Sequence, residues 1–138
     1  MDSLSPNIFV KDLPATIAFY KRLGFELTMT VPALPAGASE AASPAEPGAE
    51  LVWAMMVCGN VSFMFQTFQS LGDTLPRISR QDGGSLLLYI NLKNIHSFFE
   101  KIKEKATIVA GLEKTFYGAT EFSISDNNNF ILTFAEHT

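Results

Sequence analysis

Apolar residues recur along this chain at two spacings, every second residue in several short runs and every third or fourth residue in two others. In the first half, Asp12 followed by Pro14 predicts the start of a helix, and Gly24 predicts its end. Gly59 and Asn60 divide a long apolar run and predict a hairpin. The predicted strands of this half are residues 5–10 and 25–31 and the two arms of the hairpin at 51–68.

The second half repeats this order of elements. Asn94 is predicted to cap a helix over residues 95–105. Each half therefore predicts one strand, one helix and then three strands, the order βαβββ. The predicted strands of the second half are residues 85–92, 107–116, 120–125 and 129–136.

The repeat can be aligned in register near both ends of each half. Asp12 then corresponds to Asn94, and Met64 corresponds to Thr133. Because each half is too short for a secure core of its own, we expect the two to pack together as one α+β domain. The expected boundaries are 1–138 for the single domain, about 1–70 for module 1, about 83–138 for module 2 and 32–50 for a mobile loop rich in alanine and proline.

The amino-acid composition limits the classes of binding partner and the cell compartment that we expect for this protein. Hydrophobic residues make up 47% of the chain, and the net charge of −4 comes without a stripe of lysine and arginine that could bind nucleic acid. No apolar stretch approaches the roughly 20 residues of a membrane helix, and the first residues lack the build of a signal peptide. We therefore expect a cytoplasmic protein that binds neither nucleic acid nor membrane. The single cysteine, Cys58, is expected to be buried and inert.

Two stretches carry a resemblance to a known family. "VKDLPATIAFYKRLGFEL" and "YGATEFSISDNNNFILTF" resemble the vicinal oxygen chelate superfamily of glyoxalase I, extradiol dioxygenases, fosfomycin-resistance enzymes and bleomycin resistance proteins. The resemblance covers nearly the whole chain apart from residues 32–50. It implies two βαβββ modules that form a curved mixed sheet around a concave cavity, the glyoxalase/bleomycin resistance fold. Residues 126–129 replace the family's frequent Asp-Pro-Asp-Gly turn, which asparagine can preserve because it tolerates a left-handed backbone.

The positions at which metal-binding members carry their ligands are readable here. The family uses a histidine or glutamine on the first strand of each module and a glutamate on the last. The corresponding residues of this chain are Ser5, Met64, Leu87 and Thr133. These side chains cannot make a site for a divalent cation, which needs imidazole or carboxylate ligands. The expectation is therefore no metal, no cofactor and no catalytic residue, and the resemblance is to the metal-free branch that includes bleomycin resistance proteins.

Alternation along the strands predicts one apolar and one mixed sheet face. The apolar residues expected against the helices are Ile8, Val10, Phe63, Phe65, Leu86, Leu88, Ile90, Phe130, Leu132 and Phe134. The other face mixes rings and methyl groups with amides and hydroxyls, which suits a pocket for a small amphipathic molecule. The ligand-binding candidates are Asn7, Phe9, Trp53, Ser62, Met64, Gln66, Leu87, Tyr89, Tyr117, Glu121 and Thr133. The alternative is a mixed face that packs against its twin in a dimer.

Three candidates have two interpretations each. Trp53 is a core ring or a stacking wall for a ligand, and Tyr117 is a lid residue or a turn residue. Glu121 is the only carboxylate expected to point inward. If Glu121 is buried its pKa should rise, which would make it an acid/base group or the partner of a cationic ligand group. The alternative for Glu121 is a solvated glutamate on an edge strand.

These observations predict a metal-free protein that binds a small amphipathic or aromatic molecule. The resemblance to bleomycin resistance proteins implies a homodimer. One alternative is a metal-dependent enzyme of the glyoxalase or dioxygenase type with atypical ligands such as Glu121, Glu136 and His137. Another is a structural module whose sheet faces are filled by its own side chains.

Overall fold

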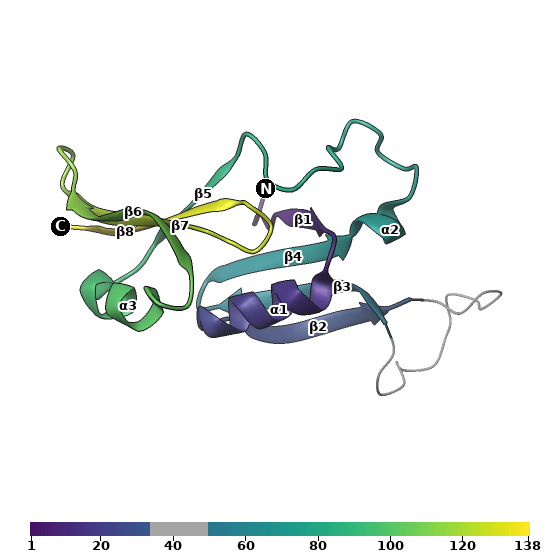
Figure 1. Cartoon of the computed structure of the whole chain (residues 1–138), viewed down its shortest axis with the longest axis horizontal. Helices are drawn as coiled ribbons and strands as arrows, with labels where there is room; N and C mark the ends of the chain where they lie inside the picture. Colours follow the sequence, from purple (N-terminus) through teal and green to yellow (C-terminus); the bar gives the residue numbers. More distant parts are fainter. Residues whose placement is uncertain (34–49) are drawn as a thin grey trace. The chain divides into compact units, whose positions relative to one another are not determined.

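A computed structural model describes residues 1–33 and 50–138 of the chain. These residues form two compact units, Met1–Arg80 and Gln81–Thr138. Each unit contains one four-stranded mixed sheet, so the fold is α+β as the sequence predicts (Figure 1). The loop expected over 32–50 lies, except at its ends, outside the described residues.

The first unit places one helix against one face of its sheet. Strand order is β1-β4-β3-β2, with β1 parallel to β4 and the other pairs antiparallel. Helix α1 contacts β2, β3 and β4 (Figure 1), and the ring of Tyr20 at the centre of this contact lies 4.8 Å from that of Phe65 and 5.6 Å from that of Phe63. The elements are β1 (Asn7–Val10), α1 (Leu13–Arg22), β2 (Glu26–Pro32), β3 (Leu51–Cys58), β4 (Val61–Thr67) and a short helix α2 (Phe68–Leu71).

Both predicted ends of α1 are confirmed. The carboxylate of Asp12 accepts a hydrogen bond from the Ala15 amide at 3.0 Å, as a helix cap does. At the other end, Gly24 has a φ of +105°, and the Phe25 amide donates to the Tyr20 carbonyl at 3.0 Å. The rings of Tyr20 and Phe25 lie 5.4 Å apart, which supplies the apolar contact typical of this helix ending.

The second unit repeats the topology of the first. Its strand order is β5-β8-β7-β6, with β5 parallel to β8. The ladders also match, because Asn7 pairs with Met64 in the first unit and Tyr89 pairs with Thr133 in the second. These pairs are the ones that the sequence repeat aligns. The elements are β5 (Leu87–Asn91), α3 (Ile95–Ile102), β6 (Thr107–Lys114), β7 (Ala119–Ser125) and β8 (Ile131–His137).

Asn94 occupies the N-cap position of the second helix as predicted, but its side chain does not cap the helix. Asn94 adopts a left-handed backbone with a φ of +61°, and its side chain makes no cap bond. The carboxylate of Glu136 on β8 takes this role, accepting from the Asn94 amide at 2.9 Å and from the Ile95 amide at 3.1 Å. The helix ends at Ile102 and not at residue 105.

The turn between β7 and β8 is built around Asp126. Its carboxylate accepts from the Asn128 amide at 2.8 Å and from the Phe130 amide at 2.9 Å. Asn129 has a φ of +63°, the left-handed conformation that the sequence led us to expect from an asparagine. Gly83 lies against this turn, since a Cβ atom there would stand 2.8 Å from the Asn129 carbonyl oxygen.

Burial follows the predicted alternation for six of the ten residues expected against the helices, whereas Leu88, Ile90 and Phe130 are only half-buried. Ile8, Phe65 and Leu132 are buried as expected. Leu86, expected against a helix, is 50% exposed because it precedes the first paired residue of β5. Cys58, expected to be buried, is exposed where β3 ends at the hairpin turn. In the described part of the chain, no helix is long and apolar enough to cross a membrane.

Candidate functional site

The open face of the second sheet, the face away from α3, carries a group of polar and aromatic side chains. Tyr89 on β5 and Glu121 on β7 flank the central strand β8, and His137 ends that strand. Tyr117 reaches the same group from the turn between β6 and β7. We call Tyr89, Tyr117, Glu121 and His137 the tyrosine–glutamate cluster.

Two tyrosine hydroxyls in this cluster converge on one carboxylate oxygen. Tyr89 donates to Glu121 Oε2 at 2.5 Å, and Tyr117 donates to the same atom at 2.6 Å. The Nε2 atom of His137 lies 3.1 Å from the Tyr89 oxygen. The imidazole centroid is 6.1 Å from the ring of Tyr89 and 6.5 Å from that of Tyr117. The carboxylate is therefore surrounded by three rings.

The hydrogen bonds fix the charge of Glu121. Donation from Tyr117 and Tyr89, with a smaller contribution from the charge of His137, lowers the pKa of Glu121 below its usual value. The same bonds raise the pKa of both tyrosine hydroxyls, since Glu121 favours their protonated forms. The sequence argument made a raised pKa conditional on burial, and Glu121 is only half-buried. Glu121 is thus a carboxylate at neutral pH and a poor proton donor.

Thr133 lies at the centre of this face and is only 5% exposed. Its hydroxyl is 2.8 Å from that of Ser123, which stands opposite it on β7. Ser123 was not among the predicted site residues, and His137 was named only as an atypical ligand of the alternative metal-dependent enzyme. The alternation that identified Thr133 would have reached His137 had the predicted strand not ended one residue early.

Six predicted site residues share the open face of the first sheet, the face away from α1. Asn7 donates from Nδ2 to Gln66 Oε1 at 3.0 Å, and Trp53 stands opposite Gln66 on β3. Phe9 packs against Phe68 at a centroid distance of 6.4 Å. All but Asn7 are half-buried. The six are Asn7, Phe9, Trp53, Ser62, Met64 and Gln66.

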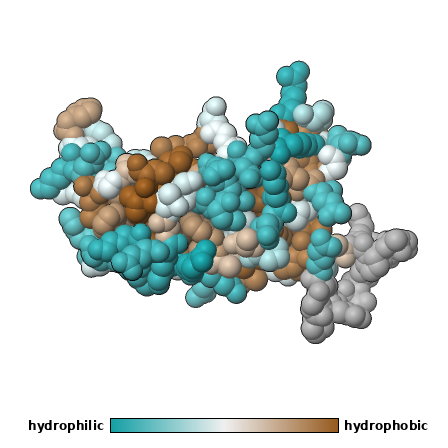
Figure 2. All heavy atoms as spheres, viewed as in Figure 1, coloured by the Kyte–Doolittle hydropathy of each residue, from teal (hydrophilic) through white to brown (hydrophobic). Residues whose placement is uncertain are grey.

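The remaining predicted residues belong to the open face of the second unit. Leu87 is 50% exposed and precedes Tyr89 by two residues on β5, so the two share a face. With Tyr117, Glu121 and Thr133 they form the second group of candidates. Figure 2 shows hydrophilic side chains over much of the visible surface, with apolar side chains reaching it in places.

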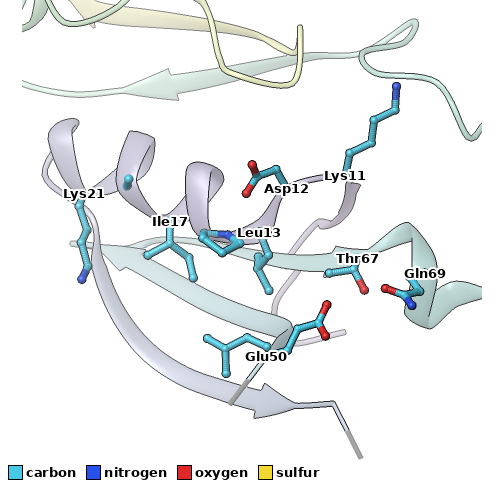
Figure 3. A pocket seen from close by; sticks show the side chains of 11 residues that line it. Lys11, Asp12, Leu13, Ile17, Lys21, Glu50, Thr67 and Gln69 are labelled. Atoms are coloured by element: carbon cyan, nitrogen blue, oxygen red, sulfur yellow. The ribbon is translucent and has the colours of Figure 1, made fainter. Parts of the chain in front are cut away.

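Each unit also has a surface hollow that includes residues outside these faces. In the first unit, a hollow of about 760 Å³ lies between α1 and residues at the ends of β3 and β4. Leu13 and Ile17 extend from α1 on one side of it, with Glu50 on the other (Figure 3). In the second unit, a hollow of about 550 Å³ is lined by Asn91, Leu92, Lys93, Glu136 and His137, and so borders the cluster.

The positions where the resembled family carries metal ligands do not fit a divalent cation. The Ser5 hydroxyl lies 2.9 Å from that of Ser62, and the Thr133 hydroxyl is bonded to Ser123. Met64 offers a thioether and Leu87 a hydrocarbon side chain. None of these groups is the imidazole or carboxylate that such a cation prefers.

The atypical ligand set proposed from the sequence does not form one site. Glu136 is engaged with the first amides of α3, whereas its neighbour His137 points to the opposite face of β8. Over residues 1–33 and 50–138, no three side chains of histidine, cysteine, aspartate or glutamate are grouped so as to hold a metal. Glu121 and His137 remain together, and Glu136 is separate from them.

Comparison with known proteins gives a consistent result for sequence family and fold. The model of the Glyoxalase/Bleomycin resistance protein/Dioxygenase superfamily matches residues 3–134. No curated protein sequence matches the chain. Among solved structures, TioX from Micromonospora sp. ML1 is 15% identical with a TM-score of 0.70, and the alignment covers 100% of both chains.

Two further solved structures share the fold. A glyoxalase/bleomycin resistance protein/dioxygenase family enzyme from Burkholderia phytofirmans PsJN is 17% identical with a TM-score of 0.67, over 96% of this chain and 95% of that chain. A bleomycin-binding protein complexed with bleomycin is 18% identical with a TM-score of 0.59, over 100% of both chains. At these identities the likeness establishes the architecture alone.

Proposed function

The chain belongs to the glyoxalase/bleomycin resistance protein/dioxygenase superfamily, and on that premise we propose that it is a small-molecule-binding protein that works without a metal. The proposed ligand is amphipathic or aromatic and is held against an open sheet face. The solved complex of a bleomycin-binding protein with bleomycin supports ligand binding as one use of this fold. The side chains at the family's metal positions support a function without a metal.

The observation that carries the proposal is the chemistry of the open face of the first sheet. On β1, β3 and β4 this face carries rings, a thioether, amides and hydroxyls and no charged side chain. A sheet face in water normally carries lysine, glutamate and arginine. Half-buried side chains that are apolar in part and polar in part are the usual lining of a ligand site.

Trp53 provides a direct test, because it is the chain's only tryptophan and lies on this face. Titration with bleomycin and with a panel of smaller aromatic amphipathic compounds should give a saturable change in Trp53 emission for at least one compound. Isothermal titration calorimetry should return the same dissociation constant. A folded protein that binds no compound of the panel in either measurement would contradict the proposal.

A charge placed on the open face should abolish this binding. Met64→Lys puts an ammonium group at the centre of the first sheet, where a half-buried charge is costly to desolvate and blocks the face. The matched control is Leu4→Lys, which adds the same charge at a side chain that is already 86% exposed. Equal binding by the two variants would place the ligand elsewhere.

Metal content is a separate test of the proposal. We expect purified protein to contain less than stoichiometric metal, and we expect ligand affinity to be unchanged after treatment with a chelator or addition of Ni²⁺, Zn²⁺, Mn²⁺ or Fe²⁺. Stoichiometric metal that is lost in Glu121→Gln would favour the metal-dependent enzyme instead.

The proposal includes a homodimer in the cytoplasm. The family resemblance supports the dimer, and the exposed free thiol of Cys58 suits a reducing compartment. Light scattering should give twice the 15.1 kDa mass of one chain, and cell fractionation should recover the protein with cytoplasmic markers.

A further inference from the structure

Both hydroxyl protons of the tyrosine–glutamate cluster are already directed at Glu121. Both tyrosine hydroxyls donate to Glu121 Oε2. The Tyr89 hydroxyl has one proton, which it donates to Glu121. In the 3.1 Å contact between Tyr89 and His137, the Nε2–H group of His137 must therefore be the donor and the Tyr89 oxygen the acceptor. The donors of the cluster are therefore used within the cluster.

The capacity that remains in the cluster is for accepting hydrogen bonds from a bound group. Among the described residues, Glu121 Oε1 receives no hydrogen bond, since both tyrosines use Oε2. A bound group that donates hydrogen bonds would therefore find an open carboxylate oxygen beside the tyrosine rings.

The charges around the cluster favour a cation in addition to a donor. Glu113 stands directly opposite Glu121 on β6, so a second carboxylate is on the same face. Lys93, at the rim of the neighbouring hollow, interacts with Glu136 on the other side of β8. Among the described residues, His137 is the positive neighbour whose charge contributes to the lowered pKa of Glu121, after the hydrogen bonds from Tyr117 and Tyr89.

The rings beside the Glu121 carboxylate are partly exposed, so a ligand in solution can reach it. Tyr89 is 43% exposed and Tyr117 is 51% exposed. Phe116 is fully exposed and packs edge-on against Tyr117 at 5.1 Å. An apolar surface thus adjoins the carboxylate, as a ligand with one charged end and one aromatic end requires.

We propose that the tyrosine–glutamate cluster anchors the cationic end of an amphipathic ligand on the open face of the second sheet, an ammonium or guanidinium group that donates a hydrogen bond to Glu121 Oε1. This inference rests on the proposed binding function and names the chemical class of the ligand. Glu121 serves as a fixed anion, since the tyrosines hold it ionised and leave it no proton to transfer.

A pair of matched probes tests the inference. Tryptamine and tryptophol differ by an ammonium group in place of a hydroxyl, and their binding to the full chain can be measured by isothermal titration calorimetry. We expect the wild-type protein to bind tryptamine about tenfold or more tightly than tryptophol, the range of a charge-assisted hydrogen bond. Equal affinity for both probes would overturn the cation anchor.

Two variants locate the effect. Glu121→Gln should bring the affinity for tryptamine to that for tryptophol, and Tyr117→Phe should weaken tryptamine binding by a smaller factor. Glu104→Gln removes the same charge from an exposed position of the same unit and should leave the preference intact. A preference that survives in Glu121→Gln would overturn the assignment to this cluster.

The outcomes separate the inference from the proposed function. If neutral aromatic compounds bind as well as cationic ones, the binding function holds and the cation anchor fails. If no compound binds to a protein whose circular dichroism is that of a folded chain, both fail. Circular dichroism of each variant excludes unfolding as the cause of lost binding.

Discussion

Glu136 illustrates how a single side chain can act far from its place in the sequence. It lies 42 residues after Asn94, yet its carboxylate accepts hydrogen bonds from the amides of Asn94 and Ile95 at the start of α3. The helix N-terminus carries a partial positive charge, so a carboxylate is favoured there. The bonds from Ile95 and Asn94 lower the pKa of Glu136.

Replacement of Glu136 should therefore destabilise the protein in a pH-dependent way. Glu136→Gln should lower the melting temperature by a few degrees at pH 7. Because the folded-state pKa is below the unfolded value, the stability that Glu136 contributes is present above the unfolded pKa and is lost as the pH falls through the folded pKa. The difference in melting temperature between wild type and variant should shrink below about pH 4.5.

The control for this measurement is Glu26→Gln, an exposed glutamate of the first unit. Its melting temperature should follow that of the wild type at each pH. A Glu136→Gln difference that grows toward acid pH would contradict the role of Glu136 as a helix cap.

Glu121 shows why residue-scale chemistry was only partly predictable. The alternation of side chains along the predicted strand placed Glu121 on the open face and so made it a candidate. Its ionisation depends on Tyr89, which is 32 residues away, and on the turn that brings Tyr117 back over the strand. Such convergence arises from the ladder register and the turn shape, which periodicity does not specify.

At the scale of elements, the two helices begin with the same topology and different caps. Asp12 caps α1 from its own N-cap position, whereas its repeat counterpart Asn94 leaves the role to Glu136. The sequence rule for N-caps was correct for the first helix. It located the N-cap position of the second helix but not the cap bond, because asparagine is also favoured in the left-handed backbone that Asn94 adopts.

Removal of the first cap should cost a predictable amount. Asp12→Ala should lower the free energy of unfolding by about 1 kcal/mol, because the Ala15 amide loses its acceptor. Asp12→Asn keeps an acceptor oxygen and should restore most of the loss. Chemical denaturation at pH 7 measures both, and an Asp12→Asn variant as unstable as Asp12→Ala would contradict the cap.

The β7–β8 turn makes a second prediction at this scale. Gly83→Ala combines a φ of +77° with a Cβ atom 2.8 Å from the Asn129 carbonyl oxygen. The backbone strain alone costs about 1–2 kcal/mol, and the contact adds to it. Gly111→Ala, where a Cβ atom would meet nothing within 4 Å, is the matched control. Denaturation curves should show a loss for Gly83→Ala alone.

Strand positions were more predictable than strand ends. Period-two alternation identified all eight strands, because each sheet packs one face against a helix and carries a more polar set of side chains on the other. Helix α2 was missed because it is a four-residue turn that Thr67 caps through the Ser70 amide. An element this short has no periodicity to detect.

For the whole molecule, the repeat was the most informative signal. Its alignment of Met64 with Thr133 is reproduced by the two parallel ladders, in which these residues pair with Asn7 and Tyr89. The repeat predicts the topology that the two units share, but it does not predict which side chains occupy equivalent positions of their open faces. The first unit has Trp53 opposite Gln66, whereas the second has Glu121 opposite Ala135 at the corresponding rungs.

The net charge of −4 gives a prediction at the same scale. A cationic ligand should be attracted by the whole chain as well as by Glu121, and exposed charges are screened over about 10 Å at 0.1 M salt. The affinity for tryptamine should therefore fall as salt is raised from 20 to 500 mM, while that for tryptophol stays constant. Parallel salt dependence of the two probes would contradict an electrostatic contribution.

The last two residues of β8 face opposite ways, Glu136 toward the amides of α3 and His137 toward the cluster. A cation bound at Glu121, which lies in the electrostatic reach of His137, should perturb the end of this strand and with it the Glu136 carboxylate, which accepts from two backbone amides. In a proton–nitrogen correlation spectrum, the signals of Asn94 and Ile95 should then move on binding, although neither residue touches the ligand. The amide signals at the start of α3 would therefore show whether a ligand is bound on the opposite face of the sheet.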